Sequence, residues 1–171
     1  MSDSPVVRRS PVKPCDCNLA RSFELIGDRW TLLVLRSAMY GVRRFDDFQA
    51  ELEVPRSVLS ARLAALVDAG IMEKRCYREE GQRARIEYPL TQMGQELGLP
   101  FFAMTAWGDK WLDEGQGAPV YYIHQDCGQR FTPILVCSEC QQTVHTRNVK
   151  PELNQQFWQN QAMQHPLKAK F

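Results

Sequence analysis

Apolar residues between positions 17 and 38 recur at the spacing of an amphipathic helix. They are Leu19, Phe23, Ile26, Trp30, Leu33 and Val34. The dipeptide Gly27-Asp28 interrupts the series. We expect Gly27 to take the left-handed conformation that ends one helix, and Asp28 to cap the free amides of the next. The pattern therefore predicts two short helices that meet at a tight corner.

Two further helices are predicted after this corner. One begins near Phe45, where Asp46 and Gln49 have the spacing of a capping box. The other runs from about residue 55 to residue 69, with Pro55 at its first position and Gly70 as its C-terminal stop. Its apolar stripe consists of Leu59, Leu63, Leu66 and Val67.

The opposite face of this fourth helix carries small side chains. They belong to Ser57, Ser60, Ala61 and Ala64, and Arg56 and Arg62 flank them. An ordinary solvated helix face carries long Glu and Lys side chains. The small face therefore favours a docking surface over plain exposure to water.

Apolar and polar residues alternate in the next segment, which is typical of a half-buried strand. Residues 71–78 and 83–90 are predicted to form two strands joined by residues 79–82. In the second strand Arg83 and Arg85 alternate with Ala84 and Ile86. The sequence thus predicts a hairpin with a basic edge.

Thr91 is predicted to cap a helix that is rich in large apolar side chains. A helix on a small core needs only one narrow apolar face, so we expect a partner chain to cover the surplus. The predicted dimer interface consists of Leu97, Phe101, Met104, Trp107 and Trp111. The alternative is that the core of a single chain covers these aromatic residues.

Length, charge and cysteine content narrow the class of protein. A chain of 171 residues holds one main domain and a small appendage, and a net charge of +1 restricts any basic surface to a local patch. Neither a secretory signal nor a membrane-spanning apolar run is visible, so we expect a cytoplasmic protein. Six cysteines in a reducing cytosol indicate metal binding, redox sensing or burial rather than disulfides. The predicted organisation is a flexible basic arm (1–14), a main domain (15–114), a linker (115–120), a Cys/His segment (121–149) and a tail (150–171).

Helices followed at once by a hairpin are the element order of the winged helix-turn-helix, whose last helix enters the major groove of DNA. The predicted fold class is α+β, mainly α, with a dimerisation helix and a small C-terminal Cys/His hairpin module. In double-stranded DNA we expect Arg56, Ser57 and Ser60 to reach base edges, and Arg62 to lie nearer the backbone. Phosphate contacts are predicted for Arg43, Arg44, Arg78, Gln82, Arg83 and Arg85. The alternative for the hairpin arginines is a set of surface ion pairs with Glu79, Glu80 and Glu87.

Several short segments keep a characteristic order and spacing. They are Cys17-Asn18, Gly27-Asp28-Arg29-Trp30-Thr31-Leu32-Leu33, Arg44-Phe45, Val58-Leu59-Ser60-Ala61-Arg62-Leu63, and Glu87-Tyr88-Pro89-Leu90-Thr91 with Gly94. Together they resemble the HxlR-type winged-helix (MarR-like) regulators of bacteria. The resemblance implies a homodimeric repressor or activator that binds a palindromic operator and has no catalytic activity. Val54 departs from the family pattern, which usually has a capping residue there, and a lost cap costs about 1 kcal/mol.

The C-terminal segment contains residue types and spacings that suit zinc. His124-x-x-Cys127-Gly128 is followed by Cys137-x-x-Cys140, and these four side chains are ligands for a tetrahedral ion. We expect a structural zinc, because so small a segment has too little apolar surface to fold alone. His145 is a reserve ligand. The alternatives are a metal-free hairpin with incidental thiols and a redox pair of Cys137 and Cys140.

Cys17 is a candidate redox sensor. The resemblance implies this role, because some relatives sense electrophiles or oxidants through a cysteine at the matching position. The electrophile or oxidant would then be the effector. A helix N-terminus promotes thiolate reactivity, and Cys15 would be the resolving thiol. The alternative is that Cys17 simply packs, as Cys76 is expected to do. Two rival functions for the whole chain are a protein-interaction adaptor that uses the zinc module, and a thiol-based redox enzyme.

Overall fold

A computed structural model describes residues 12–78 and 83–164 of the chain. The chain divides into two compact units, one formed by Cys17–Ile134 and the other by Met1–Asp16 together with Leu135–Phe171. Most of the predicted basic arm lies outside the described residues.

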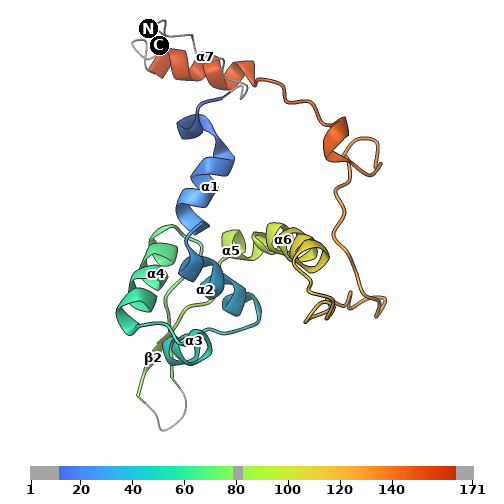
Figure 1. Ribbon diagram of the computed structural model, residues 1–171. Coiled ribbons are helices and arrows are strands. Elements are labelled where there is room, and N and C mark those ends of the chain that lie inside the picture. Colours follow the sequence, from blue (N-terminus) through green and yellow to red (C-terminus); the bar gives the residue numbers. More distant parts are fainter. Residues whose placement is uncertain (1–11, 79–82, 165–171) are drawn as a thin grey trace, which may run out of the picture. The chain divides into compact units, whose positions relative to one another are not determined.

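The first unit contains all the elements predicted for the main domain (Figure 1). They are α1 (Asn18–Ile26), α2 (Arg29–Met39), α3 (Phe45–Leu52), α4 (Arg56–Asp68), β1 (Arg75–Tyr77), β2 (Arg85–Glu87), α5 (Gln92–Glu96) and α6 (Gly98–Trp111). In its described part the second unit contains η1 (Pro14–Asp16), η2 (Thr146–Asn148) and α7 (Gln155–Gln164).

The core of the first unit lies between α2, α3 and α4. α2 contributes Val34 and Leu35, and α3 contributes Phe48. α4 contributes most of its predicted stripe, namely the buried residues Leu59, Leu63 and Leu66. Burying a side chain of this size stabilises the fold by about 1.5–3 kcal/mol. This stripe therefore determines which face of α4 is turned away from the core.

The corner between α1 and α2 confirms one predicted role and corrects another. Asp28 caps α2, since its Oδ1 accepts hydrogen bonds from the N–H groups of Trp30 at 3.0 Å and Thr31 at 3.1 Å. The expected left-handed conformation of Gly27 is wrong, because its φ is −75°. Glycine is needed for space instead: a Cβ at this position would lie 2.5 Å from the carbonyl oxygen of Phe23.

The start of α3 also differs from the prediction. The helix begins at Phe45, its N-cap is Arg44, and the side chain of Arg44 does not cap it, so the expected capping box is wrong. Asp46 and Asp47 stand in the first turn instead. Their negative charges at this end of α3 interact favourably with the positive end of the helix dipole and stabilise the helix. α3 ends at Leu52, and its C-cap Glu53 has a left-handed φ of 49°.

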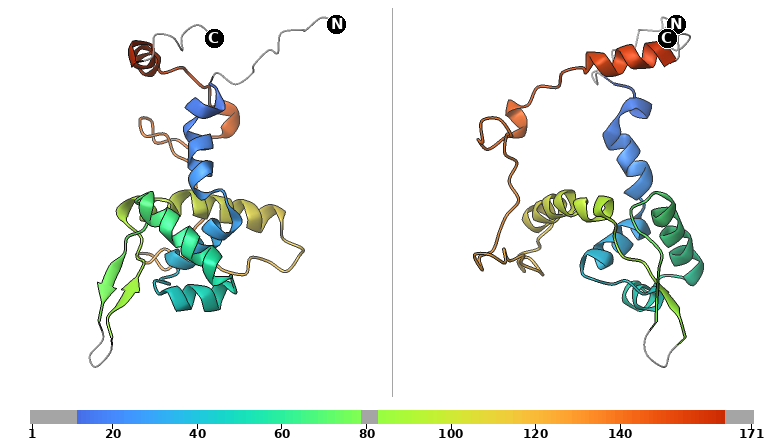
Figure 2. Two further views of the ribbon diagram at one scale, coloured as in Figure 1. Left: turned by 90° about the vertical axis from the view of Figure 1, so that its left-hand side faces the viewer. Right: turned by 180° about the vertical axis from the view of Figure 1, so that it is seen from behind.

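The wing is an antiparallel hairpin in which Arg75 pairs with Glu87, Cys76 with Ile86 and Tyr77 with Arg85. Its strands are shorter than predicted, although an isolated bridge between Met72 and Leu90 continues the pairing toward the core. Figure 2 shows the hairpin extending away from the helices. The hairpin therefore projects beyond the helices of the first unit.

The predicted helix after Thr91 consists of two helices, α5 and α6, joined at Leu97. Thr91 caps α5 as expected, since its Oγ1 accepts a hydrogen bond from the N–H of Gly94 at 3.2 Å. The same hydroxyl donates to the carbonyl oxygen of Gly70 at 2.7 Å. The second bond attaches the start of α5 to the turn that directly follows α4.

Candidate nucleic-acid interface

The outer face of α4 is exposed and made of small side chains. Arg56, Ser57, Ser60, Ala61 and Ala64 are all exposed on this helix. The helix stops cleanly, because Gly70 adopts a φ of +73° just beyond its last turn. The result is a rigid rod with a narrow outer side, as the sequence predicts for a helix that lies in a groove.

The N-terminus of α4 has no side-chain cap among the described residues. Val54 stands where a capping residue is expected, and its side chain is only 2% exposed because it joins the core. The N-cap position itself is Pro55. The first amides of the helix therefore point outward without a side-chain acceptor, which leaves them able to bind an anionic oxygen.

Arg56 is held beside this N-terminus by contacts with α3. Its guanidinium donates to Oε1 of Gln49 at 2.7 Å and lies 3.6 Å from Oδ1 of Asp46. It also stacks 4.8 Å from the ring centroid of Phe45. Because the Arg56 side chain remains 66% exposed, these contacts orient it without removing it from water.

Arg62 lies on the other flank of α4 and is paired with the cap of α2. Its Nε is 3.0 Å from Oδ1 of Asp28, and its Nη2 donates to Oδ2 of the same carboxylate at 3.3 Å. The hydrogen bond from Nη2 and the close approach of Nε hold the guanidinium beside the carboxylate. Arg62 therefore ties α4 to α2, a structural role that the sequence pattern did not predict.

The wing arginines divide into two groups. Arg75, which the sequence pattern does not single out, forms ion pairs with Glu73 at 2.6 Å and Glu87 at 3.8 Å. Arg83 and Arg85 are exposed and form no ion pair with another described residue. The ion pairs that the described part of the wing shows therefore involve Arg75, whereas Glu79 and Glu80, two of the acidic partners in the alternative interpretation, lie outside the described residues.

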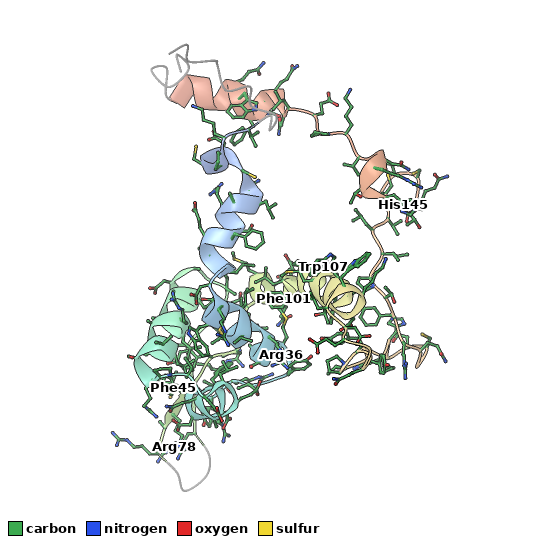
Figure 3. All side chains as sticks on the ribbon, in the orientation of Figure 1. Arg36, Phe45, Arg78, Phe101, Trp107 and His145 are labelled. Carbon is green, nitrogen blue, oxygen red and sulfur yellow. The ribbon has the colours of Figure 1, made fainter. Side chains whose placement is uncertain are left out.

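The remaining predicted phosphate contacts lie around the base of the wing. Arg44 stacks 4.9 Å from the ring centroid of Tyr77 on β1, and Arg43 is exposed. The side chain of Arg78 points away from the helices (Figure 3). Gln82 lies outside the described residues. The fold thus places the described hairpin arginines on the wing and the other two at its base.

Large apolar side chains are exposed on α6. Met104 is 53% exposed, Trp107 59% and Trp111 63%, whereas Leu97 and Phe101 pack against the core. Of the five residues predicted for the dimer interface, two therefore contact the core of their own chain and three are exposed. α1 adds a second exposed apolar face, because Leu19, Phe23 and Leu25 are all at least half exposed.

An aromatic cluster holds the start of the Cys/His segment within the first unit. The ring of Phe102 on α6 makes edge contacts with Tyr122 at 4.8 Å and Phe131 at 5.4 Å between centroids. The hydroxyls of Tyr40 and Tyr122 lie 3.0 Å apart. This hydrogen bond, together with burial, raises the pKa of Tyr40.

The predicted zinc ligands form two local pairs. His124 Nδ1 lies 3.3 Å from Cys127 Sγ. Hydrogen bonds from the backbone N–H groups of Cys140 and Glu139 lower the pKa of the Cys137 thiol. Within either unit, the described residues hold no group of three or more His, Cys, Asp and Glu side chains that could bind a metal.

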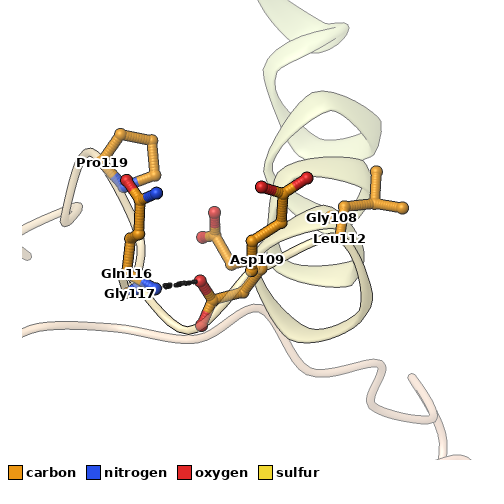
Figure 4. Close-up of a pocket in the computed structure, with 8 residues that line it drawn as sticks. Gly108, Asp109, Leu112, Gln116, Gly117 and Pro119 are labelled. Atoms are coloured by element: carbon orange, nitrogen blue, oxygen red, sulfur yellow. Dashed lines mark hydrogen bonds between the residues drawn. The ribbon is translucent and has the colours of Figure 1, made fainter.

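An open cleft of about 390 Å³ lies at the C-terminal end of α6 (Figure 4). Its carboxylates include Asp109, Asp113 and Glu114. Asp113 has a structural task, because its Oδ1 accepts the N–H groups of Gly115 at 3.0 Å and Gly117 at 3.0 Å. The cleft is thus part of the turn that ends α6.

The arrangement of α2, α3, α4 and the hairpin is that of a winged helix-turn-helix DNA-binding protein. Comparison with known proteins gives the family. The model of the HxlR-like helix-turn-helix family matches residues 25–116, more than half of the chain, and the chain belongs to this family.

Relatives and solved structures agree with this assignment. The chain is 39% identical over 135 residues to Rv3095 of Mycobacterium tuberculosis, named as an uncharacterized HTH-type transcriptional regulator, covering 79% of this chain and 84% of the relative. It is 30% identical over 95 residues to the HTH-type transcriptional regulator YodB of Bacillus subtilis, covering 55% of this chain and 83% of the relative. The crystal structure of the candidate transcription factor PA1607 matches with a TM-score of 0.71 and 27% identity, covering 81% of this chain and 96% of that one. The reduced form of YodB matches with a TM-score of 0.50 and 29% identity, covering 58% and 98%.

These names describe transcriptional regulators rather than enzymes. Among the described residues, no helix is both long and apolar enough to span a bilayer.

Proposed function

We propose that this chain is a homodimeric transcriptional repressor that reads a palindromic operator with α4. The observation that carries the proposal is the outer face of α4, which is exposed, narrow and presented by a helix whose other face is locked into the core. A major groove admits such a helix when small side chains let its backbone approach the bases.

The N-terminal half of α4 supplies the sequence reading. Ser57 and Ser60 hydrogen-bond to base edges, and Arg56 pairs with a guanine. To do so Arg56 leaves Gln49 and Asp46, which is an inexpensive exchange because exposed ion pairs are worth about 0–1 kcal/mol. The uncapped amides ahead of Arg56 bind a phosphate oxygen and take the place of the missing cap.

The wing and the flanks of α4 supply the electrostatic affinity. Arg78, Arg83 and Arg85, together with Gln82, contact phosphates beside the major groove, and Arg43 and Arg44 contact the backbone near the start of α3. Asp28 accepts a hydrogen bond from Nη2 of Arg62, which leaves Nη1 to meet a phosphate. These contacts position the protein without selecting a sequence.

A second copy of the chain covers the exposed apolar faces of α6 and α1. Met104, Trp107 and Trp111 on α6 and Phe23 on α1 are about half exposed or more in the single chain. Isolated chains rarely expose aromatic surface in this amount. A two-fold dimer buries it and sets the two α4 helices at the separation of successive major grooves, about 34–36 Å or a multiple of it.

Selection of bound DNA from a random pool, followed by footprinting of the selected duplex, tests the proposal. We expect two inverted half-sites whose centres are about 10–10.5 base pairs apart, or a multiple of that spacing. Placing the operator over the promoter of a reporter gene should lower transcription when the protein is present. A single asymmetric footprint would contradict the dimer, and raised transcription would contradict repression.

Cys17 is the site at which we propose that an electrophile or oxidant acts. It is the N-cap of α1 and only partly exposed, and its side chain does not cap the helix. Modification there would disturb α1 and with it the proposed dimer face. Diamide or quinone treatment should weaken operator binding of the wild type and leave Cys17→Ser unaffected. Unchanged operator affinity of the treated wild type would dispose of the sensor role.

A further inference from the structure

The N-terminal end of α6 is anchored in the core of the first unit, where Leu97 and Phe101 pack against the buried residues. Farther along the helix, Met104, Trp107 and Trp111 are more than half exposed. α6 has 14 residues and is therefore about 21 Å long. On a helix of this length, a small tilt at the anchored end becomes a large displacement at the other end.

Residues 120–131, which we call the strap, form a closed loop within the first unit. The N–H of Phe131 donates to the carbonyl oxygen of Tyr122 at 3.1 Å, and Ile123 and Arg130 form an antiparallel bridge. This pairing places the rings of Tyr122 and Phe131 side by side, with 6.1 Å between their centroids. The strap thus presents two aromatic rings together.

Both rings of the strap pack on α6. Phe102 makes edge contacts with Tyr122 at 4.8 Å and with Phe131 at 5.4 Å between centroids. Phe102 follows Phe101 directly, so the strap contacts α6 about 100° around the helix from the side that faces the core. These contacts give α6 a second attachment and leave the exposed residues on its remaining side.

The other end of this attachment lies on α2. The hydroxyl of Tyr122 is 3.0 Å from that of Tyr40, which is the C-cap of α2. The ring of Tyr40 stacks 5.2 Å from the guanidinium of Arg36, and Nη1 of Arg36 lies 3.8 Å from Oε1 of Glu51 on α3. Tyr122 therefore contacts α6 with its ring, and with its hydroxyl the place where α2 and α3 meet.

We propose that the strap is a positioning element for DNA recognition, in which Tyr122 fixes the angle between α6 and the helices that carry α4. The inference rests on the proposed function, in which α6 joins two copies of the chain. The angle of α6 then determines the separation of the two α4 helices. A tilt of about 10° displaces the far end of a helix of about 21 Å by about 4 Å, and one base-pair step is about 3.4 Å. The strap therefore decides which spacing of half-sites the dimer accepts.

Operators that differ only in the spacing of their half-sites test the proposal. The full-length chain is titrated with duplexes at the preferred spacing and at a spacing altered by one base pair, and with a duplex that carries a single half-site. In Tyr122→Ala the ratio of the affinities for the first two duplexes should fall about two- to tenfold, which is what a lost hydrogen bond is worth. Affinity for the single half-site should stay at the wild-type value, because α4 and the wing lie outside the strap.

Neighbouring residues supply matched controls. The ring centroid of Tyr121 lies 3.5 Å from the guanidinium of Arg130 in the strap itself, so Tyr121→Ala should keep the wild-type preference for one spacing. Tyr122→Phe keeps the ring on Phe102 and removes a hydroxyl, and Tyr40→Phe removes the other hydroxyl of the same bond. These two variants should reduce the preference equally. Tyr122→Phe carries the test if circular dichroism shows that Tyr122→Ala is unfolded.

The outcomes separate this inference from the proposed function. Tyr122 variants that keep the wild-type preference for one spacing overturn the positioning role. Variants that lose affinity for the single half-site to the same extent overturn it as well, because the strap would then only support the fold. A wild type that binds every spacing equally contradicts the two-fold dimer on which both proposals depend. The wild type alone therefore shows which of the two has failed.

Discussion

Asp28 has two structural roles, as a helix cap and as an ion-pair partner, and substitutions can separate them. Its carboxylate caps α2 through the N–H groups of Trp30 and Thr31, and it pairs with Arg62 on α4. Loss of an N-cap costs about 1 kcal/mol. The ion pair has side chains 38% and 39% exposed, and pairs this exposed contribute about 0.2–1 kcal/mol. Asp28→Ala should therefore lower the free energy of unfolding by about 1–2 kcal/mol.

Urea unfolding at a fixed protein concentration measures this loss, and Asp28→Asn is the matched control. Asparagine caps a helix as well as aspartate does, so this variant should lose only the ion pair, less than about 1 kcal/mol. Equal losses in Asp28→Ala and Asp28→Asn would refute the capping argument.

The same pair of residues tests how α4 meets DNA. If Asp28 orients Arg62 toward a phosphate, Arg62→Ala should lower the slope of log affinity against log salt by about one. Asp28→Asn keeps the arginine and should leave the slope unchanged with a smaller loss of affinity. A slope that is unaffected by Arg62→Ala would make this arginine a purely structural residue.

Two further predictions concern the DNA surface and the dimer. Arg56→Ala should weaken operator binding by about 1–3 kcal/mol and relax the sequence preference, whereas Arg83→Ala should weaken binding to all sequences alike. Gel shifts on operator and random duplexes measure both, and identical behaviour of the two variants would contradict the division into reading and positioning contacts. Trp107→Ser should shift the chain from dimer to monomer in analytical ultracentrifugation without unfolding it, because the side chain is 59% exposed in the single chain. A Trp107→Ser dimer as tight as the wild type would exclude α6 as the interface.

Periodicity predicted the elements of the winged unit, because burial decides helix and strand faces. The stripe of Leu59, Leu63 and Leu66 in the sequence identifies both the inner and the outer side of α4. Local sequence signals for caps and turns predict backbone conformation less accurately where tertiary contacts compete with them. The dipeptide Gly27-Asp28 predicts a left-handed bend, whereas in the structure Gly27 allows a close approach to Phe23.

The pattern of apolar and polar residues does not predict which side chains of different helices or strands contact each other. Nothing in the spacing of Asp28 and Arg62 shows that a helix cap on α2 will meet an arginine on α4. The exposure of Leu19 and Phe23 was missed for a related reason: an amphipathic pattern shows that a face must be covered, but not whether the cover belongs to the same chain.

Ser57→Glu tests whether the outer face of α4 lies in the major groove of DNA. Ser57 is exposed in the first turn of α4, where a negative charge favours the helix dipole, so the variant should unfold at the same temperature as the wild type or slightly higher. Opposite DNA, the same charge is repelled, and operator affinity should fall at least about tenfold. Gln95→Glu adds an equal charge at an exposed position on α5 and should bind as the wild type does. A Ser57→Glu variant that binds the operator as tightly as Gln95→Glu would contradict the account.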